Sequence, residues 1–399
     1  MKLPYGYRFS GVFSGMKRDK TRRDLSLIVS DFPAVAAGVY TTNLVYGAPV
    51  HVNRAQTPGT GFRLVVVNSG VANACTGDQG IRDAEKMIRL ALRAVGASEE
   101  EKGLVMSTGV IGEFLPMEKI AAGITDAAKS LRTEESAFLD AAKGMMTTDT
   151  VHKVSYREIR LDSGQTVRLA GMCKGAAMIG PNMATMLAVL FTDAAVLPET
   201  AKTLLRDSVE DTFNCISVEG HMSTSDTVLL LANGAAVAEP VMPGSKDFER
   251  FSEALHEVCL ELARAIPADG EGATHLITIH VKGCDSRDSA KTIAKTIAES
   301  ALVKTAVAGA DPNWGRIVSA AGYAGVALDA DQIGLSVNGY ELYRDGMPRK
   351  FDAATVSASI RDNHDTDIEL TVGEGDGAIR FWTTDLTAEY VRLNADYHT

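Results

Sequence analysis

Short apolar runs alternate with amphipathic segments along the whole of this 399-residue chain. The runs Asp24–Asp31 and Phe62–Gly70 are each closed by turn residues, which is typical of buried strands. In Ile81–Gly96 the apolar residues recur with helical spacing, charges occupy the other face, and Gly96 can cap the end. Because such helices must bury their apolar stripes against sheets, we expect an α/β fold in the broad sense.

The same patterns predict four further elements and a domain boundary. We expect a helix that begins at Pro198, a helix over 248–266, a strand over 275–283 and a helix over 289–306. The chain is long enough for two or three domains. Its composition changes near Ala238–Asp247, which predicts a domain of residues 1–240 and a smaller α/β domain of residues 241–399.

Composition and charge exclude several function classes. With 45% hydrophobic and 23% charged residues the chain has the make-up of a soluble globular protein. The net charge is −11, and the basic stretch Met16–Asp24 is interrupted by Asp, so we expect a solvated loop there and no nucleic-acid partner. No apolar run is long enough to span a membrane, and the N-terminus lacks the apolar core of a signal peptide. We therefore expect a cytoplasmic protein without a membrane partner.

The sequence predicts neither a metal nor a cofactor. The five cysteines show no metal or redox spacing, so we expect reduced, mostly buried thiols. His275 and His280 fall on opposite faces of a predicted strand and cannot share one ion. The polar run Asp362–Asp367 is typical of a solvated loop. Val372–Arg380 has alternating glycines without dinucleotide-loop spacing, which favours a turn.

One threonine follows a loop in a way that packing does not require. In "GPNMATMLAVLFTDA" (Gly180–Ala194), Thr185 stands at the start of a strand-like apolar run. A Thr hydroxyl is a poor nucleophile unless a base removes its proton. An N-terminal Thr carries such a base, since an α-amine has a pKa of about 7.7–8.0. The hydroxyl would attack the Ala184 carbonyl, and an N-to-O acyl shift and ester hydrolysis would follow. Taken alone, the segment favours a β-branched residue that opens a strand.

The stretch "KGAAMIGPNMATML" (Lys174–Leu187) closely resembles the processing-site motif of the ornithine acetyltransferases, the bifunctional enzymes of arginine biosynthesis. The resemblance extends over essentially the whole chain. Further segments that resemble the family, in family order, are Ser30–Val50, Val66–Gly80, Ser107–Pro116, Met146–Thr150, Ala268–Leu276, Gly309–Gly322 and Tyr390–Thr399. Several long motifs in order are more specific than any short pattern.

The resemblance implies a layered αββα core like that of N-terminal-nucleophile enzymes, cleavage of the Ala184–Thr185 bond, and an α2β2 heterotetramer of the two fragments. It also implies a ping-pong glutamate N-acetyltransferase, which moves an acetyl group from N-acetylornithine to glutamate through acetyl-Thr185 without a cofactor. Whether acetyl-CoA is a second donor, which would add amino-acid N-acetyltransferase activity, stays open. Two alternatives remain: a self-processed amidohydrolase or aminopeptidase, and an unprocessed homologue without catalysis.

Residue roles follow from the resemblance position by position. Thr185 matches the nucleophile, and Thr108 and Gly109 match the oxyanion hole, where donors must face the oxygen that gains charge. The expected substrate contacts are Thr147, Lys174, Thr185, Glu271, Asn394 and Thr399. Lys174 suits the substrate carboxylate and Glu271 the ornithine amine. We expect the terminal run Tyr390–Thr399 to form a last strand with Asn394 on its polar face.

The chain departs from the family at two places. Glu219–Thr227 reads "EGHMSTSDT" where the family has an Asp-Gly-Asp-Thr run, and Val71 replaces a common Asn. Neither departure changes a nucleophile, oxyanion or substrate position. The expected reaction type therefore stands, while the effect of His221 and Met222 on substrate preference stays open.

Overall fold

The computed structural model describes residues 1–180, 186–236 and 239–396. Its contacts divide the chain into two units, each built from separate segments. The first contains Met1–Gly175, Asn182–Asn214 and Met222–Ala263, and the second contains Ala176–Pro181, Cys215–His221 and Arg264–Thr399. The domain boundary near residue 240 stays a prediction.

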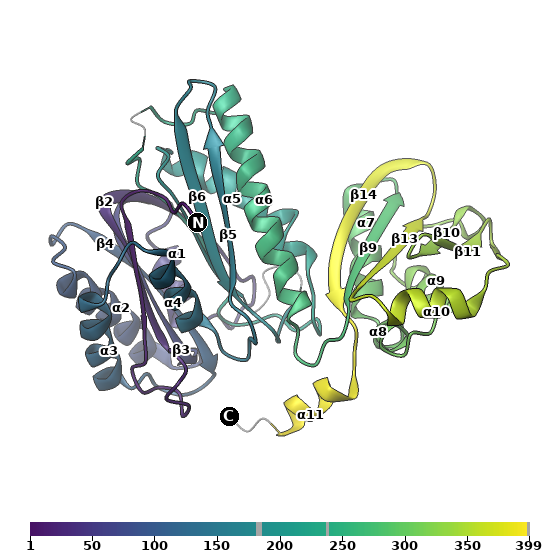
Figure 1. The fold of residues 1–399 in the computed structure, drawn as a ribbon, viewed down its shortest axis with the longest axis horizontal. Helices are drawn as coiled ribbons and strands as arrows, with labels where there is room; N and C mark the ends of the chain where they lie inside the picture. Colours follow the sequence, from purple (N-terminus) through teal and green to yellow (C-terminus); the bar gives the residue numbers. More distant parts are fainter. Residues whose placement is uncertain (181–185, 237–238, 397–399) are drawn as a thin grey trace. The chain divides into compact units, whose positions relative to one another are not determined.

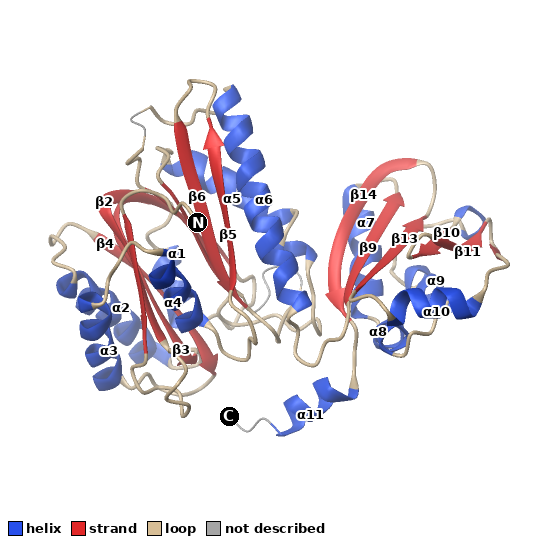
Figure 2. Ribbon diagram, viewed as in Figure 1, coloured by secondary structure: helices blue, strands red, loops and turns tan. Residues whose placement is uncertain are grey.

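The first unit holds one large mixed sheet with its helices (Figures 1 and 2). Its strands are β1 (Tyr7–Val12), β2 (Leu25–Tyr40), β3 (Gly59–Val71), β4 (Lys102–Val110), β5 (Lys153–Arg160), β6 (Thr166–Lys174), β7 (Leu187–Thr192) and β8 (Thr227–Ala232). Its helices are α1 (Ala48–Arg54), α2 (Gly77–Ala94), α3 (Met117–Lys129), α4 (Glu135–Met145), α5 (Pro198–Glu210) and the greater part of α6 (Lys246–Ala268). A short 3₁₀ turn, η1, covers Phe213–Cys215.

Strand order in this sheet does not follow chain order. Within the described residues the order is β4-β3-β2-β8-β7-β6-β5, with β1 paired to β2. Strands β7 and β8 are parallel neighbours in the middle of the sheet. On one side β8 pairs antiparallel with β2, and on the other β7 pairs antiparallel with β6. The two strands that follow Thr185 in the chain are thus inserted between strands that precede it.

The sheet buries apolar side chains on both faces. On β2, Leu27 and Val29 pack in a cluster with α2 and α3, whereas Ile28 joins a second cluster with Phe138 of α4 and Phe191 of β7. This alternation is the two-residue period of a strand with both faces covered. The second cluster takes side chains both from β3 and β4 and from β6, β7 and β8. The two halves of the sheet therefore share one inner core.

Helix α6 covers the outer face of β6. A Cβ added at Gly171 of β6 would stand 2.9 Å from Leu262 Cδ1 and 3.4 Å from Val258 Cγ1, both on α6. With α2 and α3 outside one half of the sheet and α6 outside the other, helices enclose the strand layers. The predicted layered α/β class is confirmed.

The second unit contains a smaller sheet of order β12-β11-β10-β13-β9-β14 in its described residues. Its strands are β9 (Leu276–Gly283), β10 (Gly334–Val337), β11 (Tyr340–Arg344), β12 (Met347–Pro348), β13 (Asp365–Thr371) and β14 (Gly375–Thr384). Its helices are α7 (Arg287–Glu299), α8 (Ala301–Ala308), α9 (Trp314–Gly322), α10 (Ala353–Arg361), α11 (Ala388–Asp396) and the 3₁₀ turn η2 (Ala330–Gln332).

Most predicted elements are found where the sequence placed them, with shifted ends. The single helix expected over 289–306 is two, because Ser300 adopts extended backbone angles and caps α8 through its hydroxyl and Val303 N–H. Strand β13 begins at Asp365, inside the run that we expected to be a loop. Strand β7 begins at Leu187, so the described strand starts after Thr185, which lies outside the described residues.

The expectation of a terminal strand is wrong: Ala388–Asp396 is helix α11. Thr387 precedes the helix, and its hydroxyl accepts from the Tyr390 N–H at 3.4 Å. Within the helix, Arg392 forms an ion pair with Glu389 one turn away. An alternation as short as Val391, Leu393 and Ala395 fits either period. No residue of α11 is buried, so no sheet or core selects the strand form.

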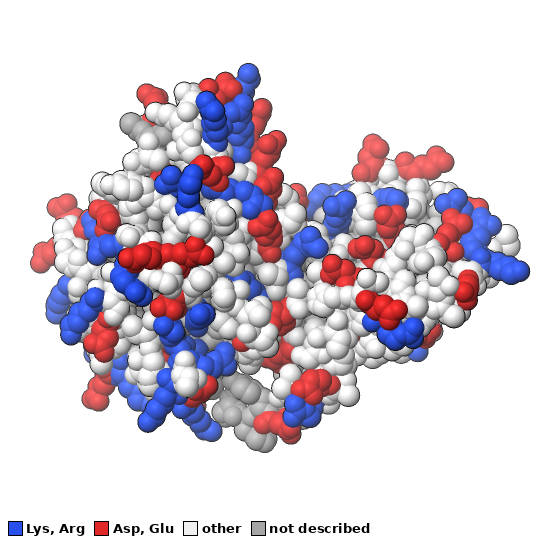
Figure 3. All heavy atoms as spheres, viewed as in Figure 1, with Lys and Arg blue, Asp and Glu red and all other residues white. Residues whose placement is uncertain are grey.

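Surface charge and helix composition relate to the nucleic-acid and membrane partners considered in the sequence analysis. On the face drawn in Figure 3, acidic and basic side chains are interspersed and neither sign forms a large field. Within the part of the chain that the structure describes, no helix is both long and apolar enough to cross a membrane.

The insertion of β7 and β8 predicts how a cut chain would behave. Cleavage between Ala184 and Thr185 would give pieces of 184 and 215 residues (399 − 184 = 215). They should co-elute in size-exclusion chromatography until denaturant also removes the far-UV circular dichroism of the sheet, because separation must break the β2–β8 and β6–β7 ladders. Separation of the pieces while the dichroism is still native would contradict this interleaved arrangement.

Candidate active site

Thr108 and Gly109, the expected oxyanion residues, lie at the end of β4 beside the end of β3. The two strands are parallel, and Gly109 pairs with Gly70. Gly109 has φ of +130°, and a Cβ there would stand 2.2 Å from the carbonyl carbon of Gly70 and 2.6 Å from the backbone nitrogen of Val71. Both the backbone angle and the close approach therefore require glycine at this position.

Asn68, which the sequence analysis gave no role, fixes the same loop. Its side chain is fully buried; Oδ1 accepts from the Ser107 hydroxyl at 2.6 Å, and Nδ2 donates to the Val71 carbonyl at 2.9 Å. It thus joins the residue before Thr108 to the backbone on which Gly109 packs. The segments Val66–Gly80 and Ser107–Pro116 are separate motifs in the sequence, and the structure places them at adjacent strand ends where they form one loop region.

Lys174 lies against Thr108 in the first unit. Its Nζ is 3.4 Å from Thr108 Oγ1, and the two residues are only 2% and 3% exposed. They stand 66 residues apart in the chain, and the family resemblance assigns both of them to the site. The structure therefore brings together an expected oxyanion residue and an expected carboxylate-binding cation.

Asp149 organises the residues around Lys174, and sequence reasoning missed it. Its Oδ1 accepts from Lys153 Nζ at 2.8 Å and from Gly175 N–H at 2.7 Å, while Oδ2 accepts from Thr147 N–H at 3.0 Å. Burial alone would raise the pKa of Asp149, but Lys174, Lys153 and the Gly175 N–H outweigh it and hold the pKa well below its usual range. The carboxylate is thus permanently charged, and it fixes Thr147 and the chain beyond Lys174.

A third cation, Lys17, adds to the positive character of this cluster. Lys17 Nζ donates to the carbonyls of Arg23 and Met146, both at 2.6 Å. Burial, followed by the charges of Arg22 and Lys174, lowers the pKa of Lys17 to about 8 although Asp24 and Asp149 oppose the shift. Several cations close to one buried carboxylate leave positive potential that suits an anionic group.

Glu271 and Asn394, two further expected substrate residues, meet in the second unit. Asn394 Nδ2 donates to Glu271 Oε2 at 2.9 Å, and it also reaches the Tyr390 carbonyl at 3.0 Å within α11. The backbone N–H of Glu271 donates to the Ala176 carbonyl at 2.9 Å. The helical tail therefore brings Asn394 to Glu271, although the secondary structure differs from the expectation.

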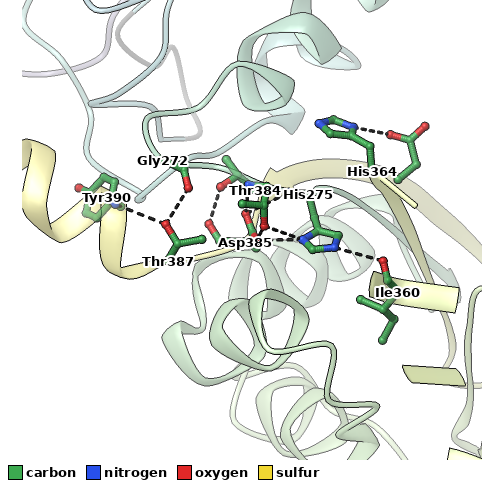
Figure 4. A network of polar contacts seen from close by, with 10 residues as sticks. Gly272, His275, Ile360, His364, Thr384, Asp385, Thr387 and Tyr390 are labelled. Atoms are coloured by element: carbon green, nitrogen blue, oxygen red, sulfur yellow. Dashed lines mark hydrogen bonds and ion pairs between the residues drawn. The ribbon is translucent and has the colours of Figure 1, made fainter. Parts of the chain in front are cut away.

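A network of polar contacts holds the tail at this position (Figure 4). The Thr387 hydroxyl donates to the Gly272 carbonyl at 2.6 Å, and Asp385 Oδ2 lies 2.9 Å from His275 Nδ1. Gly272 has φ of +69°, and a Cβ there would stand 2.4 Å from Tyr390 N. The loop that carries Glu271 is thus fitted closely to the start of α11.

Glu219 is a second acidic side chain near Glu271. Its Oε1 accepts from the Ile179 N–H at 2.6 Å. Burial raises the pKa of Glu219 to about 8, although the Ile179 N–H and Lys304 oppose the shift. Burial, with the charges of Glu219 and Glu271, likewise raises the pKa of Tyr390 to about 12. Sequence reasoning noted Glu219 only as part of an unusual run.

Three expected site residues, Ala184, Thr185 and Thr399, lie outside the described residues. The first described residue after Thr185 is Met186, whose N–H donates to Asp226 Oδ1 at 3.2 Å and whose carbonyl accepts from Thr227 N–H at 3.1 Å. Across the described ranges, no group of three or more His, Cys, Asp or Glu side chains is placed to hold a metal ion.

Comparison with known proteins decides the family. A model of the ArgJ family matches residues 8–399. The chain belongs to the ArgJ family. The arginine biosynthesis bifunctional protein ArgJ of Rhodopirellula baltica is 47% identical over 398 residues, which cover 100% of this chain and 96% of that protein. The protein of the same name from Symbiobacterium thermophilum is 43% identical over 398 residues, which cover 99% and 98% of the two chains.

A crystal structure of an ArgJ protein is also similar to this member of the family. The protein comes from Bacillus halodurans, and its chain is 36% identical with a TM-score of 0.50. The match covers 96% of that chain but 51% of this one. The family resemblance expected from the motifs is confirmed, while the roles of single residues stay predictions.

Two glycines of one loop allow a matched test of the oxyanion assignment in this ArgJ protein. Gly109→Ala should lower turnover by about 10²–10³, the usual cost of losing one oxyanion donor, because its Cβ forces the backbone away from Gly70. Gly112→Ala is the control: φ is +87° there too, but nothing lies within 4 Å of the added Cβ. It should lose some stability and keep its turnover. The measurement is kcat on folded protein, and equal kcat values for the two variants would remove Gly109 from the mechanism.

Proposed function

We propose that this ArgJ protein cleaves itself between Ala184 and Thr185 and then uses Thr185 to carry an acetyl group from N-acetylornithine to glutamate. Family membership makes the chain an acetyltransferase of arginine biosynthesis with glutamate N-acetyltransferase activity, as its motifs predict. The proposal concerns the self-cleavage, the acetyl-threonine and the residues that perform each step.

The chemistry needs a Thr with its own base. Before cleavage the Thr185 hydroxyl attacks the Ala184 carbonyl, the chain passes from amide to ester, and water hydrolyses the ester. The new α-amine, with an ordinary pKa of about 7.7–8.0, then takes the hydroxyl proton in each transfer cycle. Thr185 attacks the acetyl carbonyl of N-acetylornithine, ornithine leaves, and glutamate removes the acetyl group from the threonine.

The contact of Lys174 with Thr108 is the observation that carries the proposal. A buried cation 3.4 Å from the expected oxyanion residue gives positive potential where negative charge develops in each tetrahedral intermediate. The sheet register adds to this, because Lys174 pairs with Leu187, two residues after the proposed nucleophile. Thr147 belongs to the same cluster through Asp149.

The charges around the remaining residues fit the two ends of an amino-acid substrate. We assign the substrate carboxylate to Lys174, since positive groups surround it. We assign the ornithine amine to Glu271, whose side chain accepts from Asn394 Nδ2 and has the acidic side chain of Glu219 near it. Thr399 is proposed as a further contact from the end of the tail. Acetyl-CoA as an additional donor is left to experiment.

The length of the solved Bacillus halodurans chain supports cleavage. Nearly all of that chain matches about half of this one, which is the size expected of one fragment of a chain cut near its middle. We propose that the fragments assemble as α2β2, which predicts twice the 42.4 kDa mass of one chain in solution.

Mass and product measurements test the cleavage and the transfer together. Active protein should show fragments of 184 and 215 residues by intact mass, whereas Thr185→Ala should stay one chain and be inactive. With N-acetylornithine labelled in the acetyl group, the label should appear in N-acetylglutamate. If the active protein consists only of the full-length chain, the proposed self-cleavage is wrong. Labelled free acetate as the main product would instead identify a hydrolase.

The assignment of substrate ends predicts a selective effect for one neutralising variant and a non-selective effect for another. Glu271→Gln should raise KM for N-acetylornithine more than for glutamate, because glutamate has no side-chain amine. Lys174→Met should weaken both substrates, because both have an α-carboxylate. Steady-state kinetics on cleaved protein with each substrate varied in turn gives the comparison. Identical patterns in the two variants would show that the roles are misassigned.

A further inference from the structure

Asp226 is a buried carboxyl group next to the proposed cleavage site and has no part in the function described so far. It directly precedes β8 and is 0% exposed. Its Oδ1 accepts from the Met186 N–H at 3.2 Å, and its carbonyl accepts from the Thr41 N–H at 3.0 Å. Thr185 is the covalent neighbour of Met186, and consecutive Cα atoms lie about 3.8 Å apart. The carboxyl group is thus fixed within one residue of the reacting threonine.

The second oxygen of this carboxyl group is unused. Oδ2 is buried, and no hydrogen-bond partner reaches it within the described parts of the chain. Thr41 lies beside it, but the Thr41 hydroxyl donates to the Ser223 carbonyl at 2.8 Å. Burial raises the pKa of Asp226 well above its ordinary value, although the Met186 N–H, Thr41 and Lys174 oppose the shift. Burial without a full set of donors therefore favours the protonated form of this carboxyl group more than at an exposed aspartate.

Self-cleavage requires a proton at the neighbouring position. When Thr185 Oγ bonds to the Ala184 carbonyl carbon, the bond from that carbon to the Thr185 nitrogen must break. An amide nitrogen leaves as an amine only if it gains a proton. A proton from Asp226 Oδ2 to that nitrogen, and the hydroxyl proton returned to the resulting carboxylate, balances the step: amide becomes ester plus amine, and Asp226 ends as it began.

We propose that Asp226 is the proton donor of self-cleavage, which anchors Met186 through Oδ1 and protonates the Thr185 nitrogen through Oδ2. This inference rests on the proposed self-cleavage. The strand register places the group, since β7 and β8 are parallel neighbours in which Leu187 pairs with Thr227. Met186 and Asp226 directly precede these two strands. They are therefore opposite each other at the same end of the sheet.

Two substitutions separate proton donation from anchoring. Asp226→Asn keeps the size of the side chain and an oxygen for the Met186 N–H but has no acidic proton. Asp226→Ala loses both. If Asp226 donates the proton, both variants should accumulate uncleaved precursor, with cleavage at least about 100-fold slower than in wild type. The measurement is the fraction of 399-residue chain against time after synthesis, by intact mass. Wild-type cleavage in Asp226→Asn, with or without a defect in Asp226→Ala, would overturn the proposal.

Asp193→Asn is the matched control for the loss of a buried carboxyl group. Asp193 follows the other end of β7, is 1% exposed, and accepts from Tyr5 N–H at 2.9 Å and Arg168 N–H at 2.6 Å. Burial raises its pKa as well. This variant should cleave at the wild-type rate even if its melting temperature falls. Slow cleavage in Asp193→Asn equal to that in Asp226→Asn would show a general stability effect and overturn the assignment.

A pair of longer side chains covers the case in which Asp226→Asn does not fold. Asp226→Glu and Asp226→Gln have the same size and differ in the acidic proton, so only the former should cleave. Equal cleavage in both would overturn proton donation. Failure of the proposed function is seen separately, because wild-type protein would then show no fragments at all.

Discussion

The backbone hydrogen bonds that hold β7 and β8 inside the large sheet are the constraint on which the rest of the structure depends. The chain leaves β6 at Lys174 and returns as β7 at Leu187, and these two residues pair with each other. Twelve residues (187 − 174 − 1 = 12) therefore connect the end of β6 to the start of β7, which are neighbours at the same end of the sheet. Because the ladders begin at Leu187, a cut before Met186 removes no strand pairing, and the sheet can tolerate a break in the chain there.

The same register collects the chemistry at one end of the sheet. Lys174 stands opposite Leu187 on one side of β7, and Thr227 stands opposite it on the other. Burial of ionised groups is costly unless partners replace the lost water. Asp149 meets this cost with the ammonium of Lys153 and two backbone N–H groups, so it keeps its charge in the interior. Asp226 has no such set of donors, and burial raises its pKa. The pKa values of two buried aspartates of one unit are thus shifted in opposite directions.

The sequence predicted the class of fold, most elements and the family, because these depend on repeated patterns and long motifs. Helix α6 and strand β9 lie where periodicity placed them. The tail helix could not be predicted, since a few alternating residues without a core carry no distinctive period. Asn68, Asp149 and Asp226 were missed for another reason. Each makes at least one hydrogen bond to a segment far from it in the chain, and a single sequence contains no signal for such a contact.

The unusual run at Glu219 has a structural role that its sequence alone does not reveal. Glu219 Oε1 accepts from the Ile179 N–H, and the Ile179 carbonyl accepts from the N–H groups of Val218 and Gly220 at 2.9 and 3.0 Å and from the Ser217 hydroxyl at 3.3 Å. The chain that leads to the proposed cleavage site is therefore held in the second unit through four hydrogen bonds at one residue. Asp226 holds the chain that follows the site in the first unit. The family resemblance puts Asp where this chain has Glu219, and a carboxylate is preserved. His221 and Met222 lie just beyond it, and neither provides one of the four hydrogen bonds at Ile179. The departure thus conserves the group that fixes the backbone and changes its neighbours.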